Sequence, residues 1–219
     1  EAGDVHALEP DVVLVCTGGL PNKDIVEGAD LAVSSWDILS GDVAPAEDVI
    51  VYDDNGHQPG MQAAYMARKA GAKVEIISPE RYFAPELGAL TQAPYAEYFL
   101  THNVRMTIMS RVGRIERQGN KLKVTMVSDF TDDQPFDERL VDQVVIEHGT
   151  LPADELYFAL KEDSVNRGEV DYDALIAGRP QEIATNPDGA FQLFRLGDVV
   201  ESRNIHAAIY DALRLVRVM

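Results

Sequence analysis

The chain has 219 residues, a formal net charge of −18, and a hydrophobic fraction of 46%. This length suffices for one large domain or two small ones with a sizeable core. The negative charge repels nucleic acid phosphates and anionic membranes, so we expect neither as a partner. The single cysteine, Cys16, excludes an internal disulfide, and its position in an apolar stretch predicts a buried, inert thiol.

The predicted elements alternate between strands and helices. In chain order we expect a buried strand in 11–22, a mostly irregular stretch with a short helix near "SSWDIL" in 23–48, a strand in 48–53, a helix in 59–71, a strand in 73–78, a helical stretch in 87–103, a β-hairpin in 104–128, a loop at "TDDQPFDERL", a strand in 141–152, a short helix at "ELYFALK", a strand in 191–198 and a helix in 205–218. This order predicts an α/β fold with a parallel sheet and an antiparallel hairpin excursion.

The stretch "VIVYDDNGHQPGMQAAYMARKAGAKVEIISPE", residues 49–80, has the layout of a nucleotide-binding strand–helix–strand unit. Gly60 fits the last glycine of the Gly-x-Gly-x-x-Gly fingerprint, whereas Gly56 is one place from a fingerprint position. The paired aspartates of "YDDN" add negative charge where phosphates would lie, and the second strand ends in Ser78 rather than in an acidic residue that would hold ribose hydroxyls. Gly56 and Gly60 are candidate cofactor-binding residues, but the pattern favours a retained fold over NAD(P)H binding.

Two further glycine motifs are "CTGG" at 16–19 and "LGD" at 196–198. Alone, each is explained as a turn after a strand or as a helix cap. Together, around the dinucleotide-like stretch, they are typical of flavoproteins with two dinucleotide-binding folds, in which the aspartate hydrogen-bonds FAD and the N-terminus of the last helix faces the flavin. The candidate nucleotide-binding residues are Thr17, Gly18, Gly19, Gly197, Asp198, Asn204 and His206. No histidine spacing suits a metal site, and no catalytic set can be assigned.

These motifs, together with "VVIEHGTLPADELYFALKEDSVNRGEVDYDALIAGRPQ" and "FQLFRLGDVVESRNIHAAIYDALRL", carry a family resemblance. The chain resembles the C-terminal portion of the trimethylamine dehydrogenase and 2,4-dienoyl-CoA reductase family, and within it the dimethylglycine and N-methylproline demethylases. The resemblance covers essentially the whole chain. A first residue other than methionine and a last stretch that reads as the end of a helix agree with the expectation that this is a piece of a longer protein.

The resemblance implies Rossmann-like, three-layer nucleotide-binding domains of the glutathione-reductase-like FAD/NAD(P)-binding type. Residues 1–47 and 141–219 would form a partial FAD/ADP-binding domain without its first strand–helix–strand unit. Residues 48–140 would form an inserted NAD(P)-binding-like domain. The resemblance also implies FMN and a [4Fe–4S] cluster in an N-terminal part outside this chain.

The function that the resemblance implies is oxidative demethylation of an N-methyl amine by a cytoplasmic flavin and iron–sulfur oxidoreductase. This segment would supply FAD or ADP binding and an electron-transfer scaffold, without a catalytic residue. An electron-transfer protein and a second copy of the chain are candidate partners. Three alternatives stay open: a reductase that takes hydride from NAD(P)H at 48–80, a stand-alone nucleotide-binding or interaction module, and a purely structural role if the family lost nucleotide binding. The amine substrate and the choice between FAD and ADP also stay open.

Overall fold

The computed structural model describes all 219 residues and divides them into two compact units. The terminal unit is formed by Glu1–Leu20 and Thr150–Met219, and the central unit by Pro21–Gly149. These bounds differ from the predicted division, because residues 21–47 and 141–149 lie in the central unit. The physical reason is that both stretches contribute strands to its parallel sheet. The assignment of the units to FAD/ADP and NAD(P) stays a prediction.

The central unit is built on a five-stranded parallel sheet in the order β3–β10–β4–β5–β6. The strands are β3 (Val33–Ser34), β4 (Asp48–Asp53), β5 (Lys73–Ile77), β6 (Arg105–Thr107) and β10 (Gln143–Glu147). Strands β4, β5 and β10 were predicted, whereas β3 lies in a stretch expected to be irregular. β3 has only two residues, which is too short for a periodic pattern to show.

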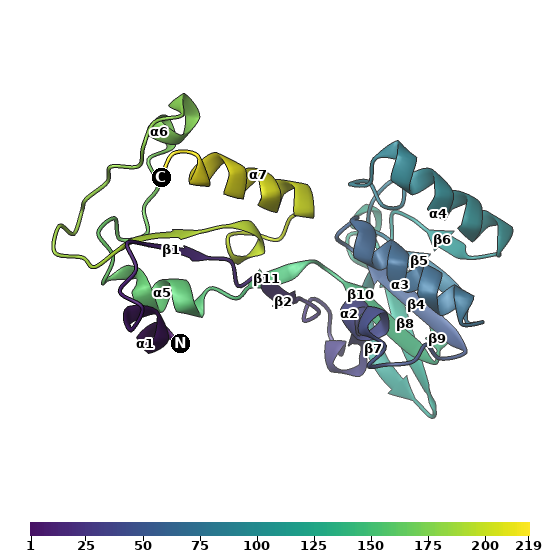
Figure 1. Ribbon diagram of the computed structural model, residues 1–219. Coiled ribbons are helices and arrows are strands. Elements are labelled where there is room, and N and C mark those ends of the chain that lie inside the picture. The colour runs from purple at the N-terminus through teal and green to yellow at the C-terminus, as the bar shows by residue number, and fades with distance from the viewer. The chain divides into compact units, whose positions relative to one another are not determined.

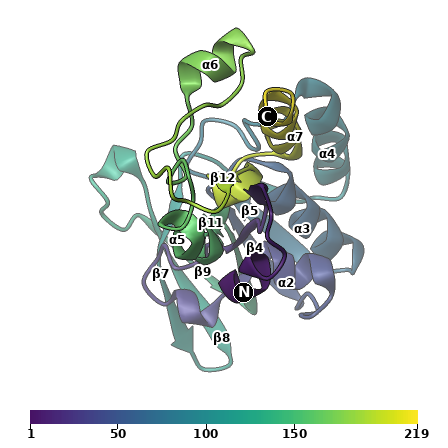
Figure 2. The ribbon, with the colours of Figure 1, turned by 60° about the vertical axis from the view of Figure 1, so that its left-hand side comes forward.

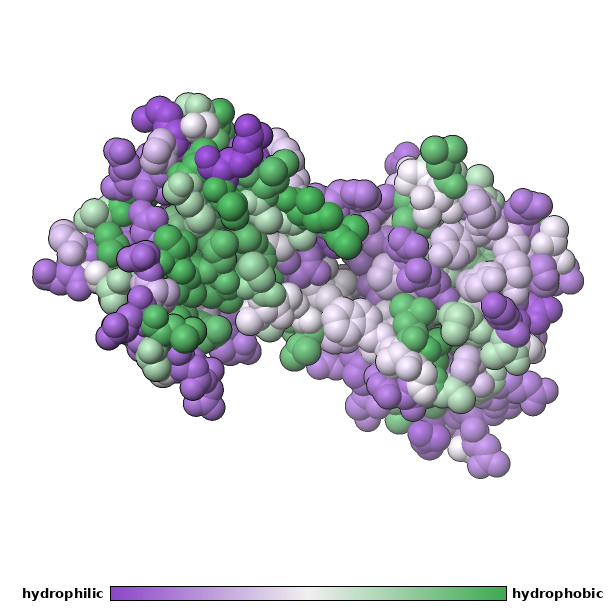
Figure 3. All heavy atoms as spheres, in the orientation of Figure 1, coloured by the Kyte–Doolittle hydropathy of each residue, from purple (hydrophilic) through white to green (hydrophobic).

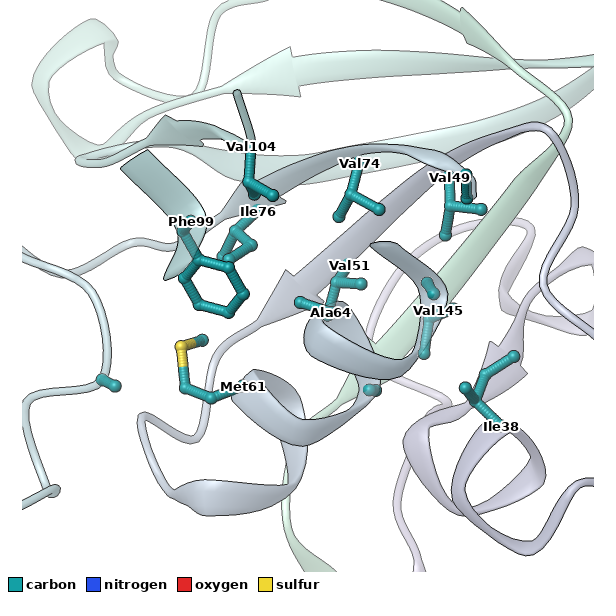
Figure 4. Packing of buried hydrophobic residues seen from close by; sticks show 14 residues of the cluster. Ile38, Val49, Val51, Met61, Ala64, Val74, Ile76, Phe99, Val104 and Val145 are labelled. Atoms are coloured by element: carbon teal, nitrogen blue, oxygen red, sulfur yellow. The ribbon is translucent and has the colours of Figure 1, made fainter. Parts of the chain in front are cut away.

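Helices cover one face of this sheet and a second sheet covers the other, as Figures 1 and 2 show. The helices are α2 (Ser35–Ser40), α3 (Gln58–Lys69) and α4 (Ala89–Thr101), and a 3₁₀ turn, η1 (Ala29–Leu31), precedes them. Because side chains alternate along β4, Val49 and Val51 face α3. Figure 4 shows Val51 beside Ala64 of α3, and both valines belong to one cluster with Met61 and Phe99.

The opposite face of the parallel sheet packs against an antiparallel sheet of three strands. It contains β7 (Arg111–Gln118), β8 (Lys121–Val127) and β9 (Asp137–Val141), with the 3₁₀ turn η2 (Asp129–Thr131) between β8 and β9. The hairpin β7–β8 was predicted, but the predicted range of 104–128 is wrong at its start, because β6 pairs with β5 in the parallel sheet. The expectation of a loop over "TDDQPFDERL" is wrong for its second half, because β9 pairs with β8 through its backbone while most of its side chains stay exposed. Because most of its side chains are exposed and polar, β9 lacks the alternation of apolar and polar residues by which a strand is predicted from sequence.

The terminal unit contains two short parallel strands, β1 (Val12–Val15) and β12 (Gln192–Arg195). Its helices are α1 (Ala2–His6), α5 (Glu155–Lys161), α6 (Tyr172–Ala177) and α7 (Ile205–Val216), with the 3₁₀ turn η3 (Gly197–Val199). The connecting strands β2 (Gly19–Pro21) and β11 (Thr150–Pro152) pair with each other. Helices α1 and α6, of five and six residues, were not predicted. None of the helices in the chain combines the length and apolar character needed to cross a membrane.

Strand β1 is less buried than its sequence suggests. Val12 and Leu14 are 38% and 37% exposed, and only Val15 is buried. Several large apolar side chains of α7 are also exposed, among them Ile205 and Ile209. In Figure 3, hydrophobic atoms gather on the face of the terminal unit to which β1 and α7 contribute. The prediction of a buried strand over 11–22 is therefore wrong for three of the four residues of β1, since Val13 is only half-buried.

Candidate functional site

A pocket of about 500 Å³ lies in the terminal unit beyond the carboxyl ends of β1 and β12, beside the start of α7. Four predicted site residues line it: Gly18, Gly197, Asp198 and Asn204. Ligand crevices of open α/β sheets lie beyond the carboxyl ends of parallel strands. The volume falls within the range of small-molecule sites, about 300–1,000 Å³. The structure therefore brings "CTGG" and "LGD", far apart in sequence, to one pocket.

The two lining glycines have left-handed backbone conformations. Gly18 has φ +72°, and a Cβ built on it would contact nothing within 4 Å. Gly197 has φ +69°, and its Cβ would lie 3.2 Å from the Cβ of Ala208. Glycine is favoured at such φ values because other L-residues are strained there. The two glycines leave bare backbone at the pocket, so that a ligand can approach it closely.

The polar groups of the pocket are few. The carboxylate of Asp198 accepts one hydrogen bond from the chain, from the backbone N–H of Arg203 at 3.3 Å. Asn204 caps α7, because its Oδ1 accepts from the N–H of Ala207 at 3.0 Å. No lysine or arginine lines the pocket. A phosphate here would therefore depend on backbone N–H groups and on the positive end of the α7 dipole.

Three other predicted residues lie outside the lining of this pocket. The hydroxyl of Thr17 donates to the carbonyl oxygen of Ala153 at 2.5 Å. Gly19 lies in β2, where a Cβ would come within 2.7 Å of the Leu151 carbonyl oxygen, so glycine permits the pairing of β2 with β11. His206 is exposed on the first turn of α7.

Sequence reasoning missed several residues of the pocket. Cys16 was expected to be buried within a strand, and this expectation is wrong: β1 ends at Val15, and the thiol is exposed and lines the pocket. Helix α7 contributes an apolar wall of four residues: Ile205, Ala208, Ile209 and Ala212. Their helical spacing was visible in the sequence but was interpreted only as the apolar face of a helix, because periodicity does not distinguish a core from a ligand-binding wall.

The central unit carries a row of buried polar side chains at the carboxyl edge of its parallel sheet. Glu147 of β10 is in register with Asp53 of β4. Ser35 and Ser78 follow the neighbouring strands directly and extend the row on either side. All four residues are buried, with Asp53 0% exposed. This edge is where the sequence predicted Gly56 and Gly60 as cofactor-binding residues.

Gly56 and Gly60 both contact their own unit closely. A Cβ on Gly56, at φ +71°, would lie 2.7 Å from the ring of Pro85. A Cβ on Gly60 would lie 2.8 Å from Cγ of Asp53. The carboxyl group of Asp53 thus lies directly against the first turn of α3. Burial is the main cause that raises the pKa of Asp53, to about 7.

The chain matches no known family model, but several curated relatives align with nearly all of it. It is 47% identical over 218 residues to the probable N-methylproline demethylase of Rhizobium meliloti, which is 99% of this chain and 32% of that protein. It is 41% identical, in an alignment of 223 positions, to the N,N-dimethylglycine/sarcosine dehydrogenase of Chromohalobacter salexigens, and this alignment covers 96% of this chain and 32% of that protein. The chain therefore spans about a third of the length of these relatives.

Solved structures confirm the predicted fold class. Histamine dehydrogenase from Rhizobium sp. 4-9 matches with a TM-score of 0.73 at 21% identity, over 99% of this chain and 32% of that chain. Thioredoxin reductase of T. acidophilum matches with a TM-score of 0.62 at 20% identity, over 93% of this chain and 62% of that chain. At these identities the likeness concerns the fold, an α/β fold of the FAD/NAD(P)-binding reductase type.

Proposed function

We propose that this chain belongs to the same family as the N-methylproline demethylases and the N,N-dimethylglycine/sarcosine dehydrogenases, and that it is the nucleotide-binding segment of a flavin-dependent enzyme that demethylates an N-methyl amine. The observation that carries the proposal is the 47% identity to the first of these over 99% of the chain. The overall reaction consumes the amine, water and an oxidant, and yields the demethylated amine, formaldehyde and the reduced oxidant. An electron-transfer protein is the proposed final oxidant.

The pocket of the terminal unit fits a nucleotide on three observations. Bare backbone at Gly18 and Gly197 allows close approach of a ligand, and the apolar wall of α7 suits a flat ring. The carboxylate of Asp198 has acceptor capacity for ribose or ribityl hydroxyls beyond its one hydrogen bond to the chain. FAD, when bound, would supply a two-electron acceptor. ADP would bind the same groups without redox chemistry.

The residues of this chain bind and orient the nucleotide rather than transform the amine. Asp198 and the Cys16 thiol are the only titratable groups that line the pocket, and no histidine, lysine or arginine is among the lining residues. Asn204 holds the first turn of α7 in place, which keeps the positive end of the helix directed at the ligand. The amine is therefore proposed to react outside this segment, with FMN and the [4Fe–4S] cluster that the family resemblance implies.

The activity test uses the native protein with N-methylproline, dimethylglycine, sarcosine and trimethylamine as separate substrates. Formaldehyde release in step with reduction of an artificial electron acceptor, for at least one of these amines, is the expected result. Oxidation of NADPH with a 2,4-dienoyl-CoA, and no turnover of any amine, would contradict the proposal and support the reductase alternative.

The binding test measures ADP and FAD affinity by calorimetry for the protein and two variants. Asp198→Ala removes a charged hydrogen-bond acceptor from the pocket, so we expect affinity to fall about 10- to 100-fold. Asp188→Ala is the matched control, because this exposed carboxylate of the terminal unit does not line the pocket. Equal affinity in all three proteins would reject the assignment of the pocket.

A further inference from the structure

The turn that joins β4 to α3 in the central unit binds a carboxyl group of its own chain. Oδ1 of Asp53 accepts hydrogen bonds from the backbone N–H groups of Gly56 at 2.9 Å and Asn55 at 3.3 Å. Oδ2 is buried and has no hydrogen-bond partner. In dinucleotide-binding folds, the N–H groups of this turn and of the following helix N-terminus receive the pyrophosphate.

Gly60 allows the carboxyl group to lie at this position. It is the third residue of α3, and a Cβ there would lie 2.8 Å from Cγ of Asp53. In the dinucleotide fingerprint, glycine at this position allows close packing of helix and strand. Here the glycine also makes room for a side chain. The space beside the first turn of α3 is thus taken by Asp53.

The surroundings of Asp53 disfavour a second anion. Its sheet neighbour Glu147 is also buried, and accepts hydrogen bonds from Asn55 Nδ2 and from the N–H of Gly149, both at 3.0 Å, and from the hydroxyl of Ser35. Asp54 is the next residue after Asp53, and its Oδ2 lies 2.8 Å from Nδ1 of His148. Three carboxyl groups, those of Asp53, Asp54 and Glu147, therefore lie at the sheet edge where a phosphate would need positive charge.

The helix itself offers fewer donors than usual. The N-terminus of an α-helix presents four free N–H groups. Pro59, the second residue of α3, has no N–H. With Gly56 and Asn55 already bonded to Asp53, the turn has few donors left for a phosphate.

We propose that the carboxyl group of Asp53 excludes the pyrophosphate of a pyridine nucleotide from the central unit by occupying its site on the β4–α3 turn. Asp53 is then a specificity-determining residue. The central unit keeps the dinucleotide-binding fold but is closed to NADH and NADPH. The proposal concerns this unit alone and does not depend on amine oxidation or on the pocket of the terminal unit.

The test measures NADPH binding by nicotinamide fluorescence and by hydrogen–deuterium exchange of the peptide that covers residues 53–60. In the unmodified protein, NADPH should leave the exchange of this peptide unchanged. Asp53→Ala frees the N–H groups of Asn55 and Gly56, so NADPH should protect the peptide and bind about 10- to 100-fold more tightly. Asp53→Asn keeps an oxygen at the same place and should behave like the unmodified protein.

Asp54→Ala is the matched control, because it removes a neighbouring carboxylate without freeing the turn. If Asp53→Ala and Asp54→Ala increased the affinity for NADPH equally, the change in net charge would explain the effect, and the proposal would be overturned. Protection of residues 53–60 by NADPH in the unmodified protein would overturn it as well, and so would a folded Asp53→Ala variant that binds no better. Circular dichroism checks the fold, and Asp53→Ser, which keeps a buried polar group, replaces the alanine variant if that one unfolds.

Discussion

The chain contains two junctions of strand, glycine and helix, and their carboxylates have different surroundings. Asp198 follows Gly197, outside β12, and contributes to an open pocket beside α7. Asp53 is the last residue of β4 and lies two residues after Val51 and four after Val49, whose side chains face α3. Because side chains alternate along a strand, the carboxyl group of Asp53 is directed under the helix. Asp53 lies within its strand, whereas Asp198 comes three residues after β12 ends at Arg195. This difference in position separates a group that can bind a ligand from a group that occupies the site.

The largest expected effect is on the pH dependence of folding. The pKa of Asp53 is raised from 3.8 to about 7 in the folded protein, chiefly by burial. The folded state then binds more protons than the unfolded state between these values, so stability falls as pH rises from about 4 to above 7. A pKa difference of this size corresponds to about 4 kcal/mol of unfolding free energy. Asp53→Asn should lose this slope, and the gain in unfolding free energy over the unmodified protein should be larger at pH 8 than at pH 5.

Urea titrations at both pH values measure this difference, with Asp188→Asn as a surface control. A gain that is the same at pH 5 and pH 8 would show that Asp53 titrates normally. In that case the carboxyl group would not be as enclosed as the structure indicates.

The next effect tests the contact between Asp53 and α3. Gly60→Ala places a Cβ 2.8 Å from Cγ of Asp53, and we expect a loss of about 2–3 kcal/mol of unfolding free energy from overpacking. Asp53→Ala combined with Gly60→Ala should recover part of this loss, because the obstructing group is gone. A double-mutant cycle in urea measures the coupling. Strict additivity would mean that the two residues do not touch.

In the terminal unit, at the junction between β12 and α7, replacing Gly197 should cost less unfolding free energy than replacing Gly60. The backbone at Gly197 has a left-handed φ, which strains an alanine. The Cβ that Gly197→Ala adds would lie 3.2 Å from Cβ of Ala208, and a small shift of α7 can relieve this contact. We expect a loss of about 1–2 kcal/mol of unfolding free energy from backbone strain, together with weaker ADP binding. Thermal unfolding with and without ADP checks both. A larger loss of stability than for Gly60→Ala would reverse the comparison of the two junctions.

The smallest effect concerns Thr17, which the sequence places with the glycines of "CTGG". Its hydroxyl bonds to the Ala153 carbonyl, and it does not line the pocket. Thr17→Ala should cost about 1 kcal/mol of stability or less and leave ADP affinity unchanged. Calorimetry on this variant decides the point. A tenfold weaker ADP affinity would place Thr17 among the binding residues after all.

The sequence by itself determined the α/β order, the helix over α3, the β7–β8 hairpin and the final helix α7, because these elements have strong local periodicity and clear glycine or proline boundaries. It also marked Gly18, Gly197 and Asp198, which the structure brings to one pocket. Short elements such as β3 and α6 carry too few residues for a pattern and escaped prediction.

Only the tertiary structure decided what these residues face. The sequence placed Asp53 beside a glycine turn, but the register of β4 with β10 and the packing of α3 put its carboxyl group on the turn N–H groups and next to Glu147. In the same way, the helical spacing of Ile205 and Ile209 predicted an apolar helix face, and the structure shows that this face lines the pocket. Periodicity reports which side chains share a face. What lies opposite that face depends on contacts between segments far apart in the chain.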